Sequence, residues 1–130
     1  MKKYNVGDIV FVSEYEYDNG RKGSNHLFVI IDSDNVAIPI EYFGFLISTQ
    51  IKKSKYNSPY EYNEPLYKTI KNGLDVDSIV KCDSLYRIPD KAILFKVGVI
   101  DPEDIERFIE SFKKWLTSQE LKIKVEVGKD

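Results

Sequence analysis

The chain has 130 residues, of which 42% are hydrophobic and 31% charged, a balance typical of a globular domain rather than a disordered chain. Its formal net charge of −2 excludes nucleic-acid binding by global attraction, so such a role would need a local basic patch. Because there is one cysteine and one histidine, and no apolar run long enough to span a membrane, we expect one cytoplasmic domain over residues 1–130, without disulfide, metal or cofactor.

The first half of the chain carries the pattern of short β-strands. Residues 6–12 predict an opening strand, and the continuous apolar run 27–31 predicts a strand that is covered on both faces. Further strands are expected over residues 36–40 and 45–51. Pro39 cannot donate a hydrogen bond to a sheet, so it predicts an edge or a bulge in the first of these.

A polar, proline-punctuated segment follows at residues 52–72 and predicts a loop or a loose hairpin. Residues 51–72 hold five lysines and two glutamates, which gives this segment a charge of +3. Lysines beside the tyrosines at 56, 60 and 62 suit single-stranded RNA, which binds through phosphate contacts and base stacking. The same tyrosines could equally pack on the rest of the domain or on a second copy of it.

The last part of the chain predicts two strands and a helix. Strands are expected over residues 77–83 and 92–99, after a turn at Asn72-Gly73. Asp101 suits the N-cap of a helix that begins with Pro102. The helix has an apolar stripe at helical spacing, formed by Ile105, Phe108, Ile109, Phe112 and Leu116.

The tail alternates strictly between apolar and polar residues over 121–127, which predicts an additional terminal strand within 119–127. Short strands followed by one helix predict a mainly β domain, a small and partly open β-barrel closed by the helix, over residues 4–117. Cys82 is expected within a strand as an ordinary half-buried thiol.

Motifs along most of residues 4–117 point to one protein family. They are the opening Val6–Val12, the loop 20–24 leading into the strand 27–31, the stretch Ile47–Lys53, and Gly73–Val80 followed by Leu85–Lys91. In this order they resemble the MazF/PemK family of endoribonuclease toxins from bacterial toxin–antitoxin modules. The resemblance implies an SH3-like small β-barrel of the MazF/PemK/CcdB type, a homodimer, and an antitoxin protein as partner.

One motif of that family is missing. The family's catalytic arginine precedes a proline at the start of the second strand, and this chain has no Arg-Pro sequence. When the apolar runs are aligned, His26 or Asn25 falls at the arginine position, and Arg21 lies farther out on the loop. The family's catalytic threonine maps to Ser48, with Thr49 as the adjacent alternative.

The resemblance implies metal-independent cleavage of single-stranded RNA, in which the 2′-OH of the RNA is the nucleophile. That reaction needs a base for the 2′-OH, an acid for the leaving 5′-oxygen and donors for the phosphate. His26 can supply acid or base function because its ordinary pKa is near neutrality, and Ser48 could bond the phosphate. No residue is assigned to the second proton transfer. The expected RNA- and phosphate-binding residues are Arg21, Lys22, Asn25, Thr49, Gln50, Lys52, Lys53 and Tyr56.

Two other interpretations stay open. The missing Arg-Pro favours an inactive barrel that serves as a protein- or nucleic-acid-interaction module, in which His26 and Ser48 are structural residues of the strands. A gyrase-poisoning toxin of the CcdB type acts through a C-terminal tryptophan, whereas Trp115 lies inside the expected helix.

Overall fold

A computed structural model describes residues 4–16, 20–34, 41–56 and 60–128. Within these ranges, one long helix, α1 (Pro102–Gly128), follows seven strands and two short 3₁₀ helices. The strands are β1 (Asp8–Glu16), β2 (Lys22–Ser33), β3 (Glu41–Ser48), β4 (Asn63–Leu66), β5 (Ser78–Lys81), β6 (Tyr86–Pro89) and β7 (Ile93–Val99). The 3₁₀ helices are η1 (Ile51–Lys53) and η2 (Asp90–Ala92).

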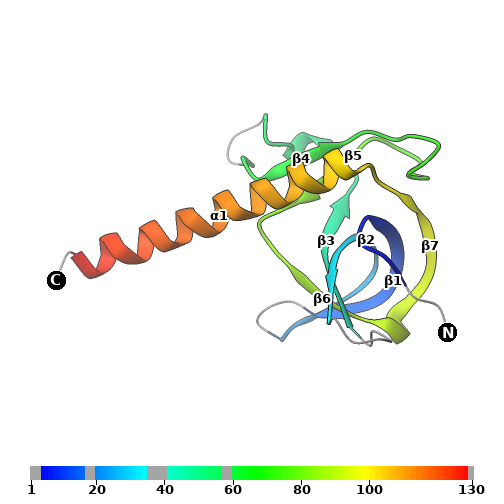
Figure 1. The fold of residues 1–130 in the computed structure, drawn as a ribbon, viewed down its shortest axis with the longest axis horizontal. Coiled ribbons are helices and arrows are strands. Elements are labelled where there is room, and N and C mark those ends of the chain that lie inside the picture. Colours follow the sequence, from blue (N-terminus) through cyan, green and yellow to red (C-terminus); the bar gives the residue numbers. More distant parts are fainter. Residues whose placement is uncertain (1–3, 17–19, 35–40, 57–59, 129–130) are drawn as a thin grey trace.

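The strands form one antiparallel sheet that curls into a ring (Figure 1). β2 pairs with both β1 and β3, and β6 pairs with β3 and β1, so these four strands make a closed circuit. The closure is uneven, because the β1–β6 side rests on the pair Glu16–Arg87 among the described residues. The predicted mainly β barrel with a C-terminal helix is confirmed.

Side chains of β2 divide between two apolar clusters. Phe28 and Ile30 belong to the cluster inside the ring, together with Val10, Tyr42 and Tyr86. Val29 belongs to a second cluster on the other face, where β3, β5 and the first turns of α1 cover the sheet. A strand buried on both faces has no polar positions to alternate, which is why the run 27–31 is continuously apolar. This prediction is confirmed.

The segment 52–72 contains a strand that the sequence does not predict. β4 pairs with β5, and all its residues, Asn63 to Leu66, are buried although two of them are polar. Asparagine, glutamate and proline are depleted in strands, so propensity argues against this element. The short strand β6 was also not predicted. The predicted strand 45–51 ends at Ser48, where η1 takes over, and the predicted strand 36–40 lies outside the described residues.

The turn at Asn72-Gly73 is confirmed. Gly73 has a φ of +69°, and a Cβ there would lie 2.3 Å from the Val97 carbonyl oxygen, so only glycine fits. The Asn72 side chain is buried and bonds backbone groups of Tyr67, Thr69 and Leu74. These bonds fix the shape of the β4–β5 connection, and the Val99 backbone nitrogen of β7 donates to its Lys71 carbonyl oxygen at 3.1 Å.

The predicted terminal strand over 119–127 is wrong, because α1 continues unbroken to Gly128. No glycine or proline occurs between Pro102 and Gly128, so no residue ends the helix before the alternating segment begins. A strand would also need a partner edge to satisfy its backbone, whereas a helix bonds its own. The predicted start of the helix at Pro102 is confirmed.

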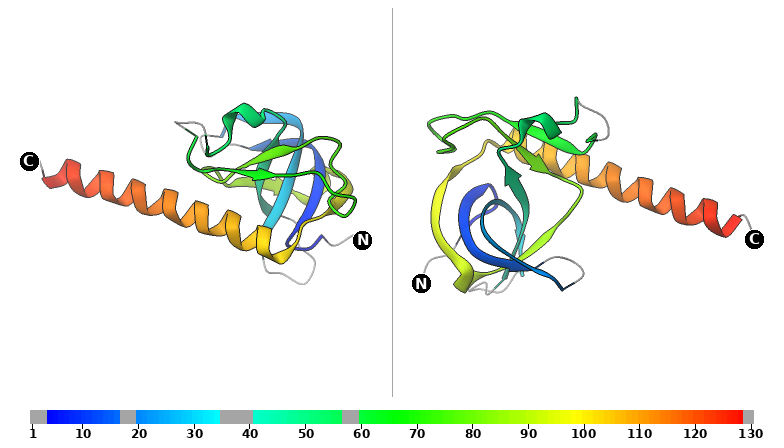
Figure 2. Two further views of the ribbon diagram at one scale, coloured as in Figure 1. Left: turned by 90° about the horizontal axis from the view of Figure 1, so that it is seen from above. Right: turned by 180° about the vertical axis from the view of Figure 1, so that it is seen from behind.

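Only the first half of α1 packs on the barrel. Phe108 is fully buried and Ile105 and Phe112 are partly buried against the second cluster, but Leu116 is 41% exposed. Figures 1 and 2 show the helix leaving the barrel and projecting beyond it in every view. No helix in the described part of the chain is long and apolar enough to cross a membrane.

Candidate functional site

His26 lies in β2, opposite Val12 of β1, and is half-buried. Its ring makes edge contacts with Tyr15 and Phe28, at centroid distances of 6.4 and 6.1 Å. These aromatic rings of the inner cluster form an apolar support on one side of the imidazole. A ring supported in this way is held in one place without a charged partner.

The hydrogen bonds of His26 leave one nitrogen for a ligand. Nδ1 lies 3.1 Å from the backbone nitrogen of Leu27 and 3.3 Å from its carbonyl oxygen. The N–H can donate to an unprotonated Nδ1, and the carbonyl can accept from a protonated one, so the backbone accommodates either tautomer. Nε2 has no hydrogen-bond partner among the described residues, and it can therefore act as acceptor or donor.

The pKa of His26 lies below its ordinary value of 6.5. Burial is the largest cause, the backbone bond to Leu27 opposes it, and the positive charge of Lys81 lowers the pKa further. Both lowering effects act against the imidazolium form. The ring is consequently neutral at pH 7, the state that a general base requires.

Ser48 ends β3 beside His26. Leu27 pairs with Ile47, so the next residues on these antiparallel strands, His26 and Ser48, occupy neighbouring positions on the same face. Ser48 is buried, and its Oγ accepts a hydrogen bond from the Gln50 backbone nitrogen at 3.2 Å. Its hydroxyl proton is left for a further acceptor.

Lys81 of β5 is a charged residue of this face that sequence reasoning missed. Ile47 pairs with Val80, which places Lys81 on the opposite side of the sheet from Val80 and on the same side as Phe28 and His26. Its charge acts on the His26 pKa, so the two groups interact electrostatically. No pattern in the sequence reveals this proximity, because it depends on how β3 and β5 pair.

The expected RNA-binding residues after β3 lie together beside this face. Thr49, Gln50 and Lys52 are exposed, and Lys53 is half-buried within η1. Tyr56 is 74% exposed. The segment 49–56 therefore presents hydroxyl, amide, cationic and aromatic groups directly after Ser48.

The RNA-binding residues expected before His26, Arg21 and Lys22, do not lie beside the face of His26 and Ser48. Arg21 and Lys22 are exposed, and Lys22 pairs with Glu16 at the far end of the β1–β2 ladder. Lys22 lines a cavity of about 230 Å³ whose walls also carry Glu14, Glu16 and Glu41. This surface has both signs of charge and is not a phosphate site of the basic type.

Asn25 is exposed and adopts a φ of +52°, a left-handed conformation that asparagine tolerates better than most residues. The backbone of β2 thus departs from the extended conformation immediately before His26, although its register with β1 is unchanged on both sides. The β2–β3 register makes His26 and Ser48 neighbours, Gln50 is bonded to Ser48, and Lys22 lies apart at the far end of the β1–β2 ladder.

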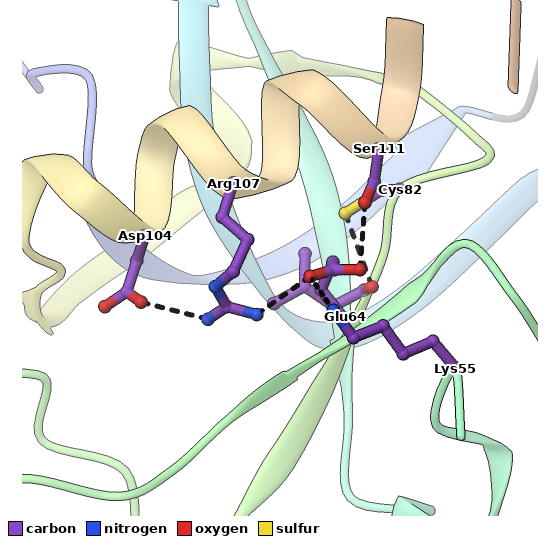
Figure 3. Close-up of polar contacts among 7 residues, drawn as sticks. Lys55, Glu64, Cys82, Asp104, Arg107 and Ser111 are labelled. Atoms are coloured by element: carbon purple, nitrogen blue, oxygen red, sulfur yellow. Dashed lines mark hydrogen bonds and ion pairs between the residues drawn. The ribbon is translucent and has the colours of Figure 1, made fainter. Parts of the chain in front are cut away.

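A buried ionic cluster joins α1 to β4 and to the segment after η1 (Figure 3). Glu64 is 2% exposed and accepts hydrogen bonds from Lys55 at 3.1 Å, Arg107 at 3.0 Å and Ser111 at 2.9 Å. Burial raises the pKa of Glu64, but the three bonds outweigh it and the pKa lies below its ordinary value. Arg107 also bonds Asp104 at 2.9 Å.

Cys82 lies beside this cluster and is fully buried. Burial raises the pKa of its thiol far above the ordinary value, and the charge of Glu64 adds to the effect. A thiol that stays protonated is a poor nucleophile, so Cys82 belongs to the core and not to the candidate site.

A groove of about 480 Å³ lies between α1 and the barrel, and His26 is not among its lining residues. It is lined mainly by apolar side chains, with two charged residues at its rim. The lining residues are Glu16, Phe43, Leu85, Arg87, Phe112, Trp115 and Leu116.

Comparison with known proteins finds a matching family model and similar solved structures. A family model described as PemK-like, MazF-like toxin of type II toxin-antitoxin system matches residues 5–116. Among solved structures, the Mycobacterium tuberculosis toxin MazF-mt6 is similar in fold, with a TM-score of 0.60 and 15% sequence identity. The match covers 85% of this chain and 96% of that one. No curated protein matches in sequence.

Proposed function

This chain belongs to the PemK-like, MazF-like toxin family of type II toxin–antitoxin systems, and we propose that it is a metal-independent endoribonuclease that cleaves single-stranded RNA in the cytoplasm. The observation that carries the proposal is the face shared by His26, Ser48 and Lys81. It combines a neutral imidazole, a hydroxyl and an ammonium group, which are the groups that RNA cleavage through the 2′-OH requires.

In the proposed reaction, Nε2 of His26 takes the proton of a ribose 2′-OH. The 2′-oxygen then attacks the adjacent phosphorus, the bond from phosphorus to the 5′-oxygen breaks, and a 2′,3′-cyclic phosphate and a 5′-hydroxyl end result. Lys81 and the Ser48 hydroxyl stabilise the charge that develops on the phosphate oxygens. The leaving 5′-oxygen takes its proton from solvent or from the imidazolium that the first step creates.

The decisive experiment compares the wild-type protein with His26→Ala on a mixture of single-stranded RNAs without divalent metal. We expect cleavage with 2′,3′-cyclic phosphate ends, detected by mass spectrometry, and a loss of about 10²-fold or more in the variant. His26→Ala should unfold at nearly the same urea concentration as the wild type, because the ring is only half-buried.

Oligonucleotides with 2′-deoxyribose at every position are the matched substrate control and should not be cut. Intact RNA after incubation with the wild-type protein, or equal cleavage by His26→Ala, would contradict the proposal.

The second candidate is an inactive barrel that binds RNA or protein. Two observations favour it: the chain has no Arg-Pro motif, and the Oγ of Ser48 already bonds the Gln50 backbone within a buried strand end. This candidate predicts RNA binding, or partner binding, without strand scission.

We include an antitoxin protein and a homodimer in the proposal. Family membership supports the antitoxin, and the apolar groove lined by Phe43, Phe112 and Trp115 supports association through the α1 side of the barrel. Sedimentation equilibrium tests the homodimer, and co-expression with the product of a neighbouring reading frame tests the antitoxin.

A further inference from the structure

We propose that Tyr56 receives one unpaired base of single-stranded RNA and that buried Glu64 positions this ring by holding Lys55. The inference rests on the proposed function only in its ligand, single-stranded RNA. It assigns roles to Glu64 and Lys55, neither of which is part of the cleavage face around His26.

Glu64 anchors the side chain of Lys55. Its ammonium group lies 3.1 Å from a carboxylate oxygen of Glu64, and Glu64 is in turn bonded by Arg107 and Ser111 of α1. The Glu64 side chain is 3% exposed and the Lys55 side chain 30% exposed. A carboxylate fixed by a helix gives this lysine a defined position that a surface lysine lacks.

Hydrogen bonds from β4 also hold the backbone around Lys55. The Asn63 side-chain amide donates to the Lys53 carbonyl oxygen at 2.7 Å, and the Lys55 backbone nitrogen donates to the Asn63 carbonyl oxygen at 2.7 Å. β4 thus holds η1 and the residues after it through two consecutive residues, Asn63 and Glu64. This explains why the two polar residues of β4 are buried.

Lys55 in turn contacts the ring of Tyr56. The ammonium group of Lys55 lies over the Tyr56 ring, 5.4 Å from its centroid. The ring is nevertheless 74% exposed. Because the cation occupies one face and most of the residue is exposed, we infer that the opposite face can receive a single stacked base.

The position of Tyr56 suits this task. It follows Ser48 by a short segment that carries exposed Thr49, Gln50 and Lys52, so an RNA strand lying along the segment would meet the ring after leaving the cleavage face. Stacking on a tyrosine works with any base, so this contact contributes affinity and register more than sequence preference.

The experiment measures binding of a fluorescein-labelled, random-sequence, 12-nucleotide 2′-O-methyl RNA by anisotropy, because this probe cannot be cleaved through a 2′-OH. We expect Tyr56→Ala to raise Kd by about tenfold, within the range measured for loss of one base–aromatic stack, and Tyr56→Phe to leave it unchanged. Lys55→Met and Glu64→Gln should each raise Kd severalfold. Asp104→Asn is the matched control, because it removes a carboxylate from Arg107 without touching Lys55, and it should not change Kd.

A double-mutant cycle separates positioning from direct phosphate contact. In the Tyr56→Ala background, Lys55→Met should add little, since the lysine acts through the ring; additive losses would overturn the positioning role. Lys55→Met leaves Glu64 bonded to Arg107 and Ser111, so it remains informative if Glu64→Gln unfolds the protein. Equal Kd for Glu64→Gln, Lys55→Met and Asp104→Asn would also overturn the inference.

Cleavage assays distinguish this inference from the proposed function. If RNA is cut and Tyr56→Ala leaves the KM for RNA unchanged, only the stacking site fails. If the probe binds through Tyr56 but RNA is never cut, only the endoribonuclease fails.

Discussion

His26 shows how much the surroundings of one residue decide its chemistry. The sequence places it at the arginine position of the resembling family, but only the structure reveals that aromatic rings support it and that Lys81 acts on it. A neutral, partly desolvated imidazole can do what an arginine cannot easily do, which is to accept a proton. The replacement is therefore compatible with activity.

Lys81 gives a pH test of this assignment. Because the charge of Lys81 lowers the His26 pKa, Lys81→Met should raise this pKa. The acidic limb of the pH profile of kcat/KM follows the pKa of the general base in the free enzyme. This limb should therefore move to higher pH in the variant. The Tyr15 ring and the Leu27 backbone stay in place in this variant. The measurement is a pH–rate profile from pH 4.5 to 8.5 for wild type and variant. An unmoved limb would mean that His26 is not the base.

Glu64 gives a separate pH test at the level of stability. Its pKa is lowered in the folded protein, so its contribution is complete above the ordinary carboxyl pKa, 4.5, and is lost as the pH falls through the lowered value. Urea unfolding should show the free energy of unfolding decreasing below pH 4.5. Glu64→Gln should be less stable by about 2 kcal/mol at pH 7, since it breaks a buried ion pair whose partners are partly exposed. The unfolding free energy of Glu64→Gln should also fall less steeply with decreasing pH than that of the wild type. An identical pH dependence in the two proteins would contradict this account.

Helices and strands with a clear hydrophobic or capping pattern could be predicted from the sequence. Strands that form because of their partners elsewhere in the chain could not. The run 27–31 and the helix start at Asp101-Pro102 carry local signals that agree with the fold. β4 carries the opposite signal, because Asn63 and Glu64 are buried to hold η1 and α1 rather than to fill a core. The strand predicted within 119–127 is wrong because alternation of apolar and polar residues does not by itself end a helix.

The uneven packing of α1 predicts an asymmetry between two residues of the same apolar stripe. Phe108 is fully buried, so Phe108→Ala should cost about 3 kcal/mol or more of unfolding free energy. Leu116 is 41% exposed, and Leu116→Ala should cost less than about 1 kcal/mol in the monomer. Urea titrations of both variants at equal protein concentration make the comparison. A large loss for Leu116→Ala would indicate that a partner covers this part of the helix.

At the scale of the whole molecule, a β-barrel followed by one helix was predictable, but β4, β6 and the pairing that closes the ring were not. The family resemblance and the strand–helix order give a barrel, and the family model and the similar solved fold support it. The sequence could nominate His26 and Ser48 for the candidate site because the family resemblance points to both positions, and the pairing of β2 with β3 makes them neighbours. Lys81 and the Glu64 cluster were missed, since each depends on a contact between strands or helices far apart in sequence.

The pairing of β1 has a consequence for how the chain is made. Its first residue, Asp8, pairs with Val99, and its last, Glu16, pairs with Arg87, so β1 finds two of its three partner strands only after β2 to β5 have been synthesised. During synthesis, β1 and β2 can form a hairpin early, but the ring stays open until β6 and β7 have left the ribosome. The aromatic support of His26 includes Tyr15 of β1, and Tyr15 packs on Tyr86 of β6. A nascent chain therefore completes the surroundings of its histidine only after β6 has been synthesised.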